Sequence, residues 1–145
     1  MPLKFSYKKF PSNPNAAFPD HKHSQRPVIP ITVKYSEKEI AYLALIDSGA
    51  DFCIFHGDIG KYLGIDVKNG KKLEFFGVTG EKECAYFHNV VISVGGHNME
   101  CYCGFSDFNN CVTQLPYGIL GQKGFFDKFK VSMDYNKSRI ELSAN

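Results

Sequence analysis

Apolar and polar residues alternate along much of this chain, with a period of two that is typical of β-strands buried on one face. The segment 35–38 is polar and Gly95-Gly96 is a glycine pair, so both are predicted as hairpin turns. A second turn-like segment, Gly77-Val78-Thr79-Gly80, separates two long predicted arms. The predicted strands are 28–34, 39–46, 52–55, 71–76, 81–94, 98–105, 118–121, 130–135 and 139–143. The pattern therefore predicts an all-β chain.

Two segments have helical character. Residues 57–64 suggest a short helix that ends at Gly64, a residue type favoured just past a helix end. Residues 122–128 suggest a second short helix near the C-terminus, with Phe125, Phe126 and Phe129 available to pack inward.

The first 26 residues differ in composition from the rest and are predicted to form an irregular N-terminal arm. Leu3, Phe5 and Tyr7 alternate, so a short strand is expected there if a partner edge is available. Four of the seven prolines lie in this segment: Pro2, Pro11, Pro14 and Pro19.

Length and composition limit the classes of function. A chain of 145 residues forms one domain, and its 13 Phe and 8 Tyr favour β structure with a filled interior. The net charge of +2 does not suggest nucleic-acid binding. No run of about 18 apolar residues suggests a membrane span. The N-terminus lacks the apolar region of a signal peptide, so we expect a cytoplasmic protein with no membrane partner.

The five cysteines raise the question of disulfides or metal. An odd number without a signal peptide favours reduced thiols. His97, Cys101, Cys103 and Cys111 lie close in sequence, but Cys101-x-Cys103 is the spacing of one strand face, not of a Cys-x-x-Cys zinc site. We therefore expect neither a metal nor a cofactor.

The strongest candidate for chemistry is Asp47-Ser48-Gly49, which follows the apolar run 40–46. A carboxylate on a tight turn after a core strand is held rigidly, as catalysis requires. Ser48 can form hydrogen bonds with nearby backbone, and Gly49 permits a turn or a close backbone approach. Taken alone, these three residues are also compatible with an ordinary strand end.

Four segments, in order, resemble the retroviral-type (retropepsin-like) aspartic proteases. Residues 25–33 resemble the strand that precedes the active site, and Leu45–Asp51 matches the hydrophobic-hydrophobic-Asp-(Thr/Ser)-Gly-Ala signature. Residues 76–80 resemble the tip of the flap, and 117–121 resemble the segment beneath the catalytic loop. The resemblance covers about residues 25–143. It implies a closed, barrel-like acid-protease fold with one short C-terminal helix, and it assigns residues 27–145 to the protease domain.

The resemblance also implies aspartic endopeptidase activity. Such enzymes use two carboxylates that share one proton around a water molecule. This chain contains only one Asp-(Ser/Thr)-Gly, so the active site is expected at a C2 homodimer interface, with one Asp47 from each subunit. The expected partners are a second copy and a peptide or protein substrate in extended conformation.

Site residues follow from the resemblance. Asp47, Ser48 and Gly49 would be catalytic, and Phe52 and Ile54 would help to form side-chain pockets. Gln122 stands where retroviral enzymes often have an Arg that pairs with the Asp at the Asp51 position, and Thr79 makes the flap more polar than is common. The substrate-binding residues would be Ala50, Asp51, Gly77, Val78, Thr79, Gly80 and Ile119.

Two other interpretations are open. One is a non-catalytic peptide-binding or dimerisation module that keeps the retropepsin fold, although such a module does not need the Asp47 carboxylate. The other is a site based on cysteine or metal, which rests only on the unpaired thiols.

Overall fold

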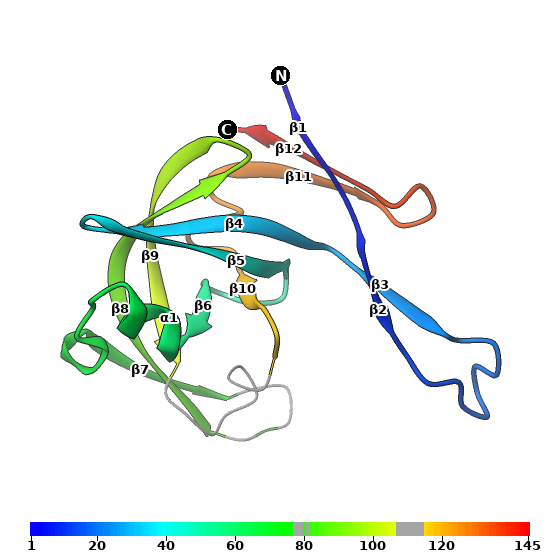
Figure 1. Cartoon of the computed structure of the whole chain (residues 1–145), viewed down its shortest axis with the longest axis horizontal. Helices are drawn as coiled ribbons and strands as arrows, with labels where there is room; N and C mark the ends of the chain where they lie inside the picture. Colours follow the sequence, from blue (N-terminus) through cyan, green and yellow to red (C-terminus); the bar gives the residue numbers. More distant parts are fainter. Residues whose placement is uncertain (77–79, 81, 107–114) are drawn as a thin grey trace.

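The structure is a computed structural model that describes residues 1–76, 80, 82–106 and 115–145. Its body is a seven-stranded sheet in the order β4-β5-β10-β6-β9-β8-β7. Strand β4 pairs with β5 and also with β8, so the sheet curls round on itself (Figure 1). This confirms the predicted all-β, barrel-like fold. The strands are β4 (Val28–Tyr35), β5 (Lys38–Ile46), β6 (Ile54–His56), β7 (Lys71–Phe76), β8 (Lys82–Val94), β9 (His97–Ser106) and β10 (Gly118–Leu120).

A three-stranded antiparallel sheet covers one end of the barrel (Figure 1). It consists of β1 (Leu3–Ser6), β11 (Phe129–Asp134) and β12 (Arg139–Ala144). The short strand predicted at the N-terminus is therefore confirmed, and its partner is the end of the chain. Strand β12 lies in the middle, with β1 on one edge and β11 on the other.

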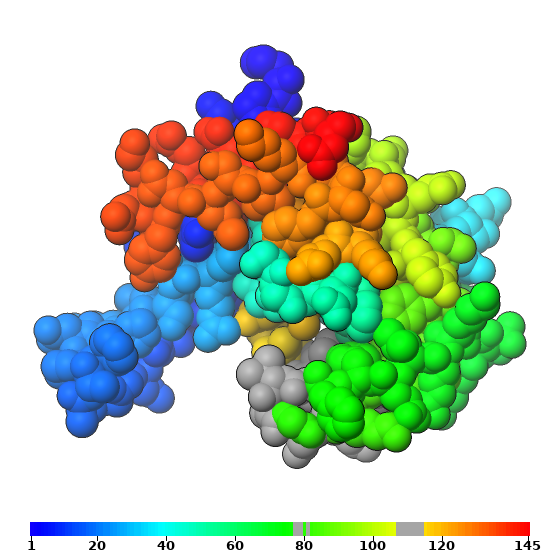
Figure 2. Space-filling model, turned by 180° about the vertical axis from the view of Figure 1, so that it is seen from behind, coloured from blue at the N-terminus to red at the C-terminus, as the bar shows by residue number. Residues whose placement is uncertain are grey.

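The remaining N-terminal residues form a hairpin rather than the irregular arm that was predicted. Strand β2 (Lys8–Pro11) pairs with β3 (His23–Arg26) in a two-stranded sheet. Figure 2 shows this β2–β3 arm, in blue, standing away from the rest of the molecule. The prediction was wrong because the prolines do not interrupt the pairing: Pro11 ends β2, while Pro14 and Pro19 lie in the connecting turn.

The helices differ in part from the prediction. Helix α1 (Gly57–Tyr62) is followed by Gly64 at φ +83°, as expected for a glycine past a helix end, and a 3-10 turn follows at Val67–Asn69. Residues 122–128 form successive turns instead of the predicted C-terminal helix, and Gly124 at φ +108° interrupts helical geometry there. In the part of the chain that is described, α1 is the single α-helix.

The core fills the barrel and the space beneath the three-stranded sheet. Phe55, Phe105 and Phe125 are its largest fully buried side chains. Phe129 is also buried and Phe126 is partly so, which confirms the inward packing predicted for this segment. Across the described residues, no helix is both long enough and apolar enough to span a bilayer.

Candidate active site

Asp47 begins the loop that follows β5, and backbone hydrogen bonds hold its position. Its N–H donates to the carbonyl of Leu120 in β10 (2.9 Å), and its carbonyl accepts the N–H of Ala50 (3.2 Å). One residue earlier, the N–H of Ile46 donates to the carbonyl of Pro27 (2.9 Å), where β3 passes into β4. The main chain on both sides of the carboxylate is therefore fixed.

The carboxylate is held by its own loop. Asp47 Oδ1 accepts the N–H of Gly49 at 2.9 Å. A Cβ atom at residue 49 would lie 3.3 Å from that same oxygen, so glycine keeps this approach unstrained. Asp47 is half-buried, whereas Ser48 and Gly49 are exposed. The loop thus presents one oriented carboxylate beside an open surface.

Strand β10 passes beneath the loop and makes its floor. It runs parallel to β5, with Ile119 opposite Leu45. A Cβ atom on Gly121 would lie 2.3 Å from the carbonyl oxygen of Phe52 and 2.7 Å from that of Ala50, so only glycine fits. The segment therefore lies beneath the loop, as the resemblance of residues 117–121 implied.

The residue after Gly121 binds the loop from below. The backbone N–H of Gln122 donates to the carbonyl of Ala50 (2.8 Å), and its side-chain Nε2 donates to the carbonyl of Ser48 (2.9 Å). Lys123 N–H donates to the carbonyl of Asp51 (2.9 Å). Gln122 therefore braces the loop through its amide. Asp51 is exposed and forms no ion pair with a described residue.

Apolar residues from several elements meet beside the loop. Ala50 and Ile119, two of the predicted substrate-binding residues, are half-buried. Ile119 packs with Phe52 on a cluster separate from the main core. Ile54 is buried in that cluster and supports the surface rather than lining it. The members of this cluster, which we call the aromatic cluster, are Ile54, Ala85, Phe87, Phe52, Phe75 and Ile119.

Strands β7 and β8 form the two predicted arms and pair from Lys71 and Phe87 as far as Phe76 and Lys82. Gly80 is an exposed residue between the arms. The predicted substrate-binding residues Gly77, Val78 and Thr79 lie outside the described residues.

Ion pairs join the two arms close to their ends. Glu74 lies 2.7 Å from Lys82 Nζ across the hairpin and 3.5 Å from Lys72 Nζ on its own strand. The hydrogen bond and charge of Lys82, with Lys72 behind it, lower the pKa of Glu74 below its usual value. These pairs are exposed, so they contribute modestly to the stability of the arms.

Two of the buried thiols, Cys53 and Cys101, are unsuited to nucleophilic chemistry. A hydrogen bond with Cys101 and burial raise the pKa of Cys53 far above its usual value. A hydrogen bond with Cys103, followed by burial, raises the pKa of Cys101 as well. Both thiols therefore stay protonated near neutral pH and are poor nucleophiles. Over the described ranges, no group of three or more His, Cys, Asp or Glu residues could hold a metal ion.

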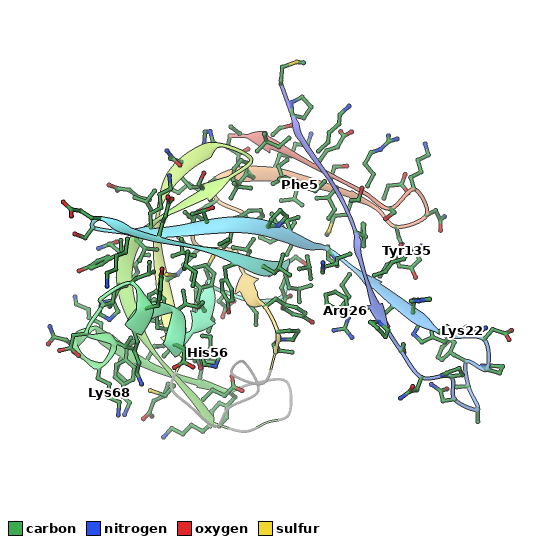
Figure 3. All side chains as sticks on the ribbon, in the orientation of Figure 1. Phe5, Lys22, Arg26, His56, Lys68 and Tyr135 are labelled. Atoms are coloured by element: carbon green, nitrogen blue, oxygen red, sulfur yellow. The ribbon has the colours of Figure 1, made fainter. Side chains whose placement is uncertain are left out.

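Two long-range hydrogen bonds, which no local pattern predicts, fasten the β2–β3 arm beside the site. Arg26 Nη1 donates to the hydroxyl of Tyr117 at 2.7 Å, across 91 positions of sequence. Gln25 Nε2 donates to the carbonyl of Tyr135 (2.6 Å), and Figure 3 shows Arg26 and Tyr135 near the base of the arm. Tyr117 directly precedes β10, so the arm is fastened to the strand that supports the Asp47 loop.

A retropepsin-like aspartic protease from Rickettsia conorii superposes with a TM-score of 0.59 over 98% of both chains, at 14% identity. This chain has a retropepsin-like fold. The protease of EIAV in complex with the inhibitor HBY-793 matches 67% of this chain and 82% of its own, with a TM-score of 0.48 and 21% identity. The sequence matches no model of a protein family and no curated protein. The retropepsin-like fold is the one that the four sequence segments predicted.

Proposed function

We propose that the protein is an aspartic endopeptidase that acts as a homodimer. The observation that carries the proposal is the Asp47 loop. Its carboxylate is oriented by the N–H of Gly49, and its backbone is held by Leu120 and Gln122. A rigid, half-exposed carboxylate of this kind suits general acid–base chemistry. The retropepsin-like fold is the context in which such a loop hydrolyses peptides.

The chemistry needs two carboxylates, and each subunit supplies one Asp47. The ionised carboxylate takes a proton from a water molecule as the water oxygen attacks the scissile carbonyl carbon. The protonated carboxylate gives its proton to the carbonyl oxygen, which forms a tetrahedral gem-diol. The first carboxyl then gives the proton from water to the leaving nitrogen as the C–N bond breaks, and the second carboxylate takes back a hydroxyl proton from the intermediate. Two carboxylates this close cannot both be ionised, so the pair titrates in two separated steps.

A twofold axis beside Asp47 fits the exposure of Ser48 and Gly49, which lie on the surface that a second copy would cover. Strand β12 already has a partner on each edge within its own subunit. Terminal strands of a second copy therefore meet the outer edge of β1 or β11, not β12. In this arrangement Ser48 braces the two loops, and Gly49 offers its carbonyl to the substrate backbone.

The substrate is an extended peptide, and the site prefers apolar substrate residues near the scissile bond. Ala50, Phe52 and Ile119 are partly exposed apolar residues beside the loop, which supports this preference. The arms β7 and β8, together with the segment 77–80, would close over the bound peptide as a flap. Asp51 and Gly80 would contact its backbone.

A peptide-library cleavage assay between about pH 4 and about pH 7 tests the proposal, with Asp47→Asn as the matched control. Substitution by asparagine keeps the shape and the acceptor for Gly49 but removes the charge that activates water. We expect the native dimer to cleave peptides. We expect the Asp47→Asn protein to cleave none, although its mass in solution shows that it is still a dimer. A stable native dimer that cleaves nothing would contradict the proposal and favour the peptide-binding module.

A further inference from the structure

A recess lies next to the Asp47 loop, on the far side of Phe52. It is a cavity of about 450 Å³, within the range of ligand-binding pockets. Strands β7, β8 and β9 form three of its sides, and the turns at 123–128 form the fourth. All the lining residues belong to one chain, so the recess exists before any dimer forms.

The floor of the recess is aromatic. Phe87 packs edge-on against Phe52, with ring centroids 5.2 Å apart, and lies 5.3 Å from the ring of Tyr102. Tyr102 and Leu73 are 46% and 39% exposed, so this floor is open to solvent. Exposed aromatic surface in a recess favours an apolar side chain from a ligand.

The rim is positively charged. The charged residues that line the recess are four lysines, Lys71, Lys72, Lys123 and Lys128, and two acidic residues, Glu100 and Asp127. Of these lysines, only Lys72 has an ion-pair partner among the described residues, so the ammonium groups of the other three are available. Asp127 already accepts the N–H of Gly124 (3.1 Å). The charge balance favours an anionic ligand.

One wall is a free strand edge. Among the described strands, β7 pairs only with β8, so its outer edge has backbone groups that an extended chain can bind. Lys71, Lys72 and Leu73 stand on this strand beside the recess. An extended peptide is therefore a better match to the recess than a compact small molecule.

We propose that this recess binds an acidic segment of the substrate polypeptide, with an apolar residue on the aromatic floor and carboxylates at the lysine rim. The inference rests on the proposed function for its choice of occupant. The recess adjoins the site, since Phe52 follows Asp51 and Lys123 N–H donates to the carbonyl of Asp51. Phe52 is five residues from Asp47. The acidic segment would therefore lie to one side of the scissile bond, next to the part of the loop formed by Asp51 and Phe52.

Direct binding tests the proposal without requiring cleavage. Fluorescence anisotropy would follow a labelled peptide of Glu and Leu, and a matched peptide of Lys and Leu, titrated with the Asp47→Asn protein. We expect the acidic peptide to bind more tightly, and its affinity to fall as salt rises. The double substitution Lys71→Glu with Lys128→Glu should weaken its binding about tenfold and improve that of the basic peptide.

Lys137→Glu is the control, because Lys137 lies in the turn between β11 and β12, outside the recess. This substitution changes the net charge by the same amount as each substitution in the recess, and it should leave the affinity for the acidic peptide unchanged. Equal binding of both peptides, or acidic binding that survives the double substitution in a folded protein, would overturn the proposal. Thermal unfolding of each variant establishes that it is folded.

Cleavage assays separate this inference from the proposed function. In an active enzyme, acidic residues on one side of the scissile bond should raise kcat/KM, and the double substitution should reverse the preference. If no peptide is cleaved but the acidic peptide still binds at the lysines, the protease proposal fails, while the proposal that the recess binds an acidic peptide is supported. If cleavage occurs without this charge preference, the recess is not part of substrate recognition.

Discussion

The side-chain amide of Gln122 donates to the carbonyl of Ser48 at 2.9 Å, which joins the floor of the candidate site to the Asp47 loop. The same residue donates its backbone N–H to Ala50. Retroviral enzymes that resemble this chain often place a charged Arg here. In this protein a neutral hydrogen bond within one subunit holds the loop.

Gln122→Glu tests this brace with almost no change in volume. An ionised Glu cannot donate to the Ser48 carbonyl, so two acceptors face each other. Because Gln122 is exposed, we expect the free energy of unfolding at neutral pH to fall by only about 0.5–1.5 kcal/mol, together with a lower kcat. Urea denaturation and peptide cleavage measure the two effects. Lys130→Gln, an exposed change on β11, is the control and should alter neither quantity.

Gly121→Ala tests the close crossing of β10 beneath the loop. The added methyl group would meet the carbonyl oxygens of Phe52 and Ala50, and backbone atoms cannot move aside as a flexible side chain can. We expect a loss of about 3 kcal/mol or more in the free energy of unfolding. Gly96→Ala is the comparison: its φ of +84° strains alanine, but no atom lies within 4 Å, so about 1–2 kcal/mol is expected. Equal losses in the two variants would show that the crossing is not tight.

Much of the fold could be predicted from local patterns. Alternation located the strands of the body, and the glycine at 64 marked the end of α1. The motif at 47–49 together with the glycine-flanked segment at 118–121 located the loop and its floor, since each needs only a few adjacent residues to be recognised.

The errors came from features of the backbone and of long-range contacts that a local residue pattern does not show. Strands β2 and β3 pair because the residues between them form a turn, and the number of prolines in the segment does not show where that turn lies. Residues 122–128 have helical character in the sequence, but Gly124 takes a conformation that a helix excludes. Gln122 was interpreted only as a missing charge, because its hydrogen bond crosses 74 positions of sequence.

Tyr117→Phe tests how the β2–β3 arm is fastened. The change removes the hydroxyl that accepts from Arg26 and leaves the buried ring in place. We expect about 1 kcal/mol of destabilisation and faster proteolysis in the connecting turn of the arm, residues 12–22. Limited proteolysis followed by mass spectrometry gives the site and rate of cleavage. Tyr62→Phe, at an exposed position in α1, should leave the proteolysis rate of the arm unchanged.

The raised pKa of Tyr42 predicts that the folded state loses stability at alkaline pH. Burial raises its pKa from 10.0 to about 12, although the N–H of His56, which donates to its hydroxyl, acts in the opposite direction. The folded protein therefore holds this proton more tightly than the unfolded chain. Its contribution is complete below pH 10 and is lost as the pH rises toward 12, by up to roughly 2–3 kcal/mol.

Denaturation of the native protein and of Tyr42→Phe at about pH 8 and about pH 11 isolates this contribution, because other groups titrate in both proteins. We expect the variant to lose less stability between the two pH values. The same slope in both proteins would show that Tyr42 does not hold its proton in the folded state.

The supports of Asp47 come from residues far along the chain, and this sets an order of events during synthesis. Leu120 and Gln122 follow Asp47 by more than seventy positions, and β1 must wait still longer for β12. A ribosome-bound chain that has passed Asp47 thus carries the motif without its floor. The loop gains these backbone supports only once residues 120–122 have been made, so a nascent or prematurely truncated chain that ends earlier carries the Asp47 motif without the contacts that hold it.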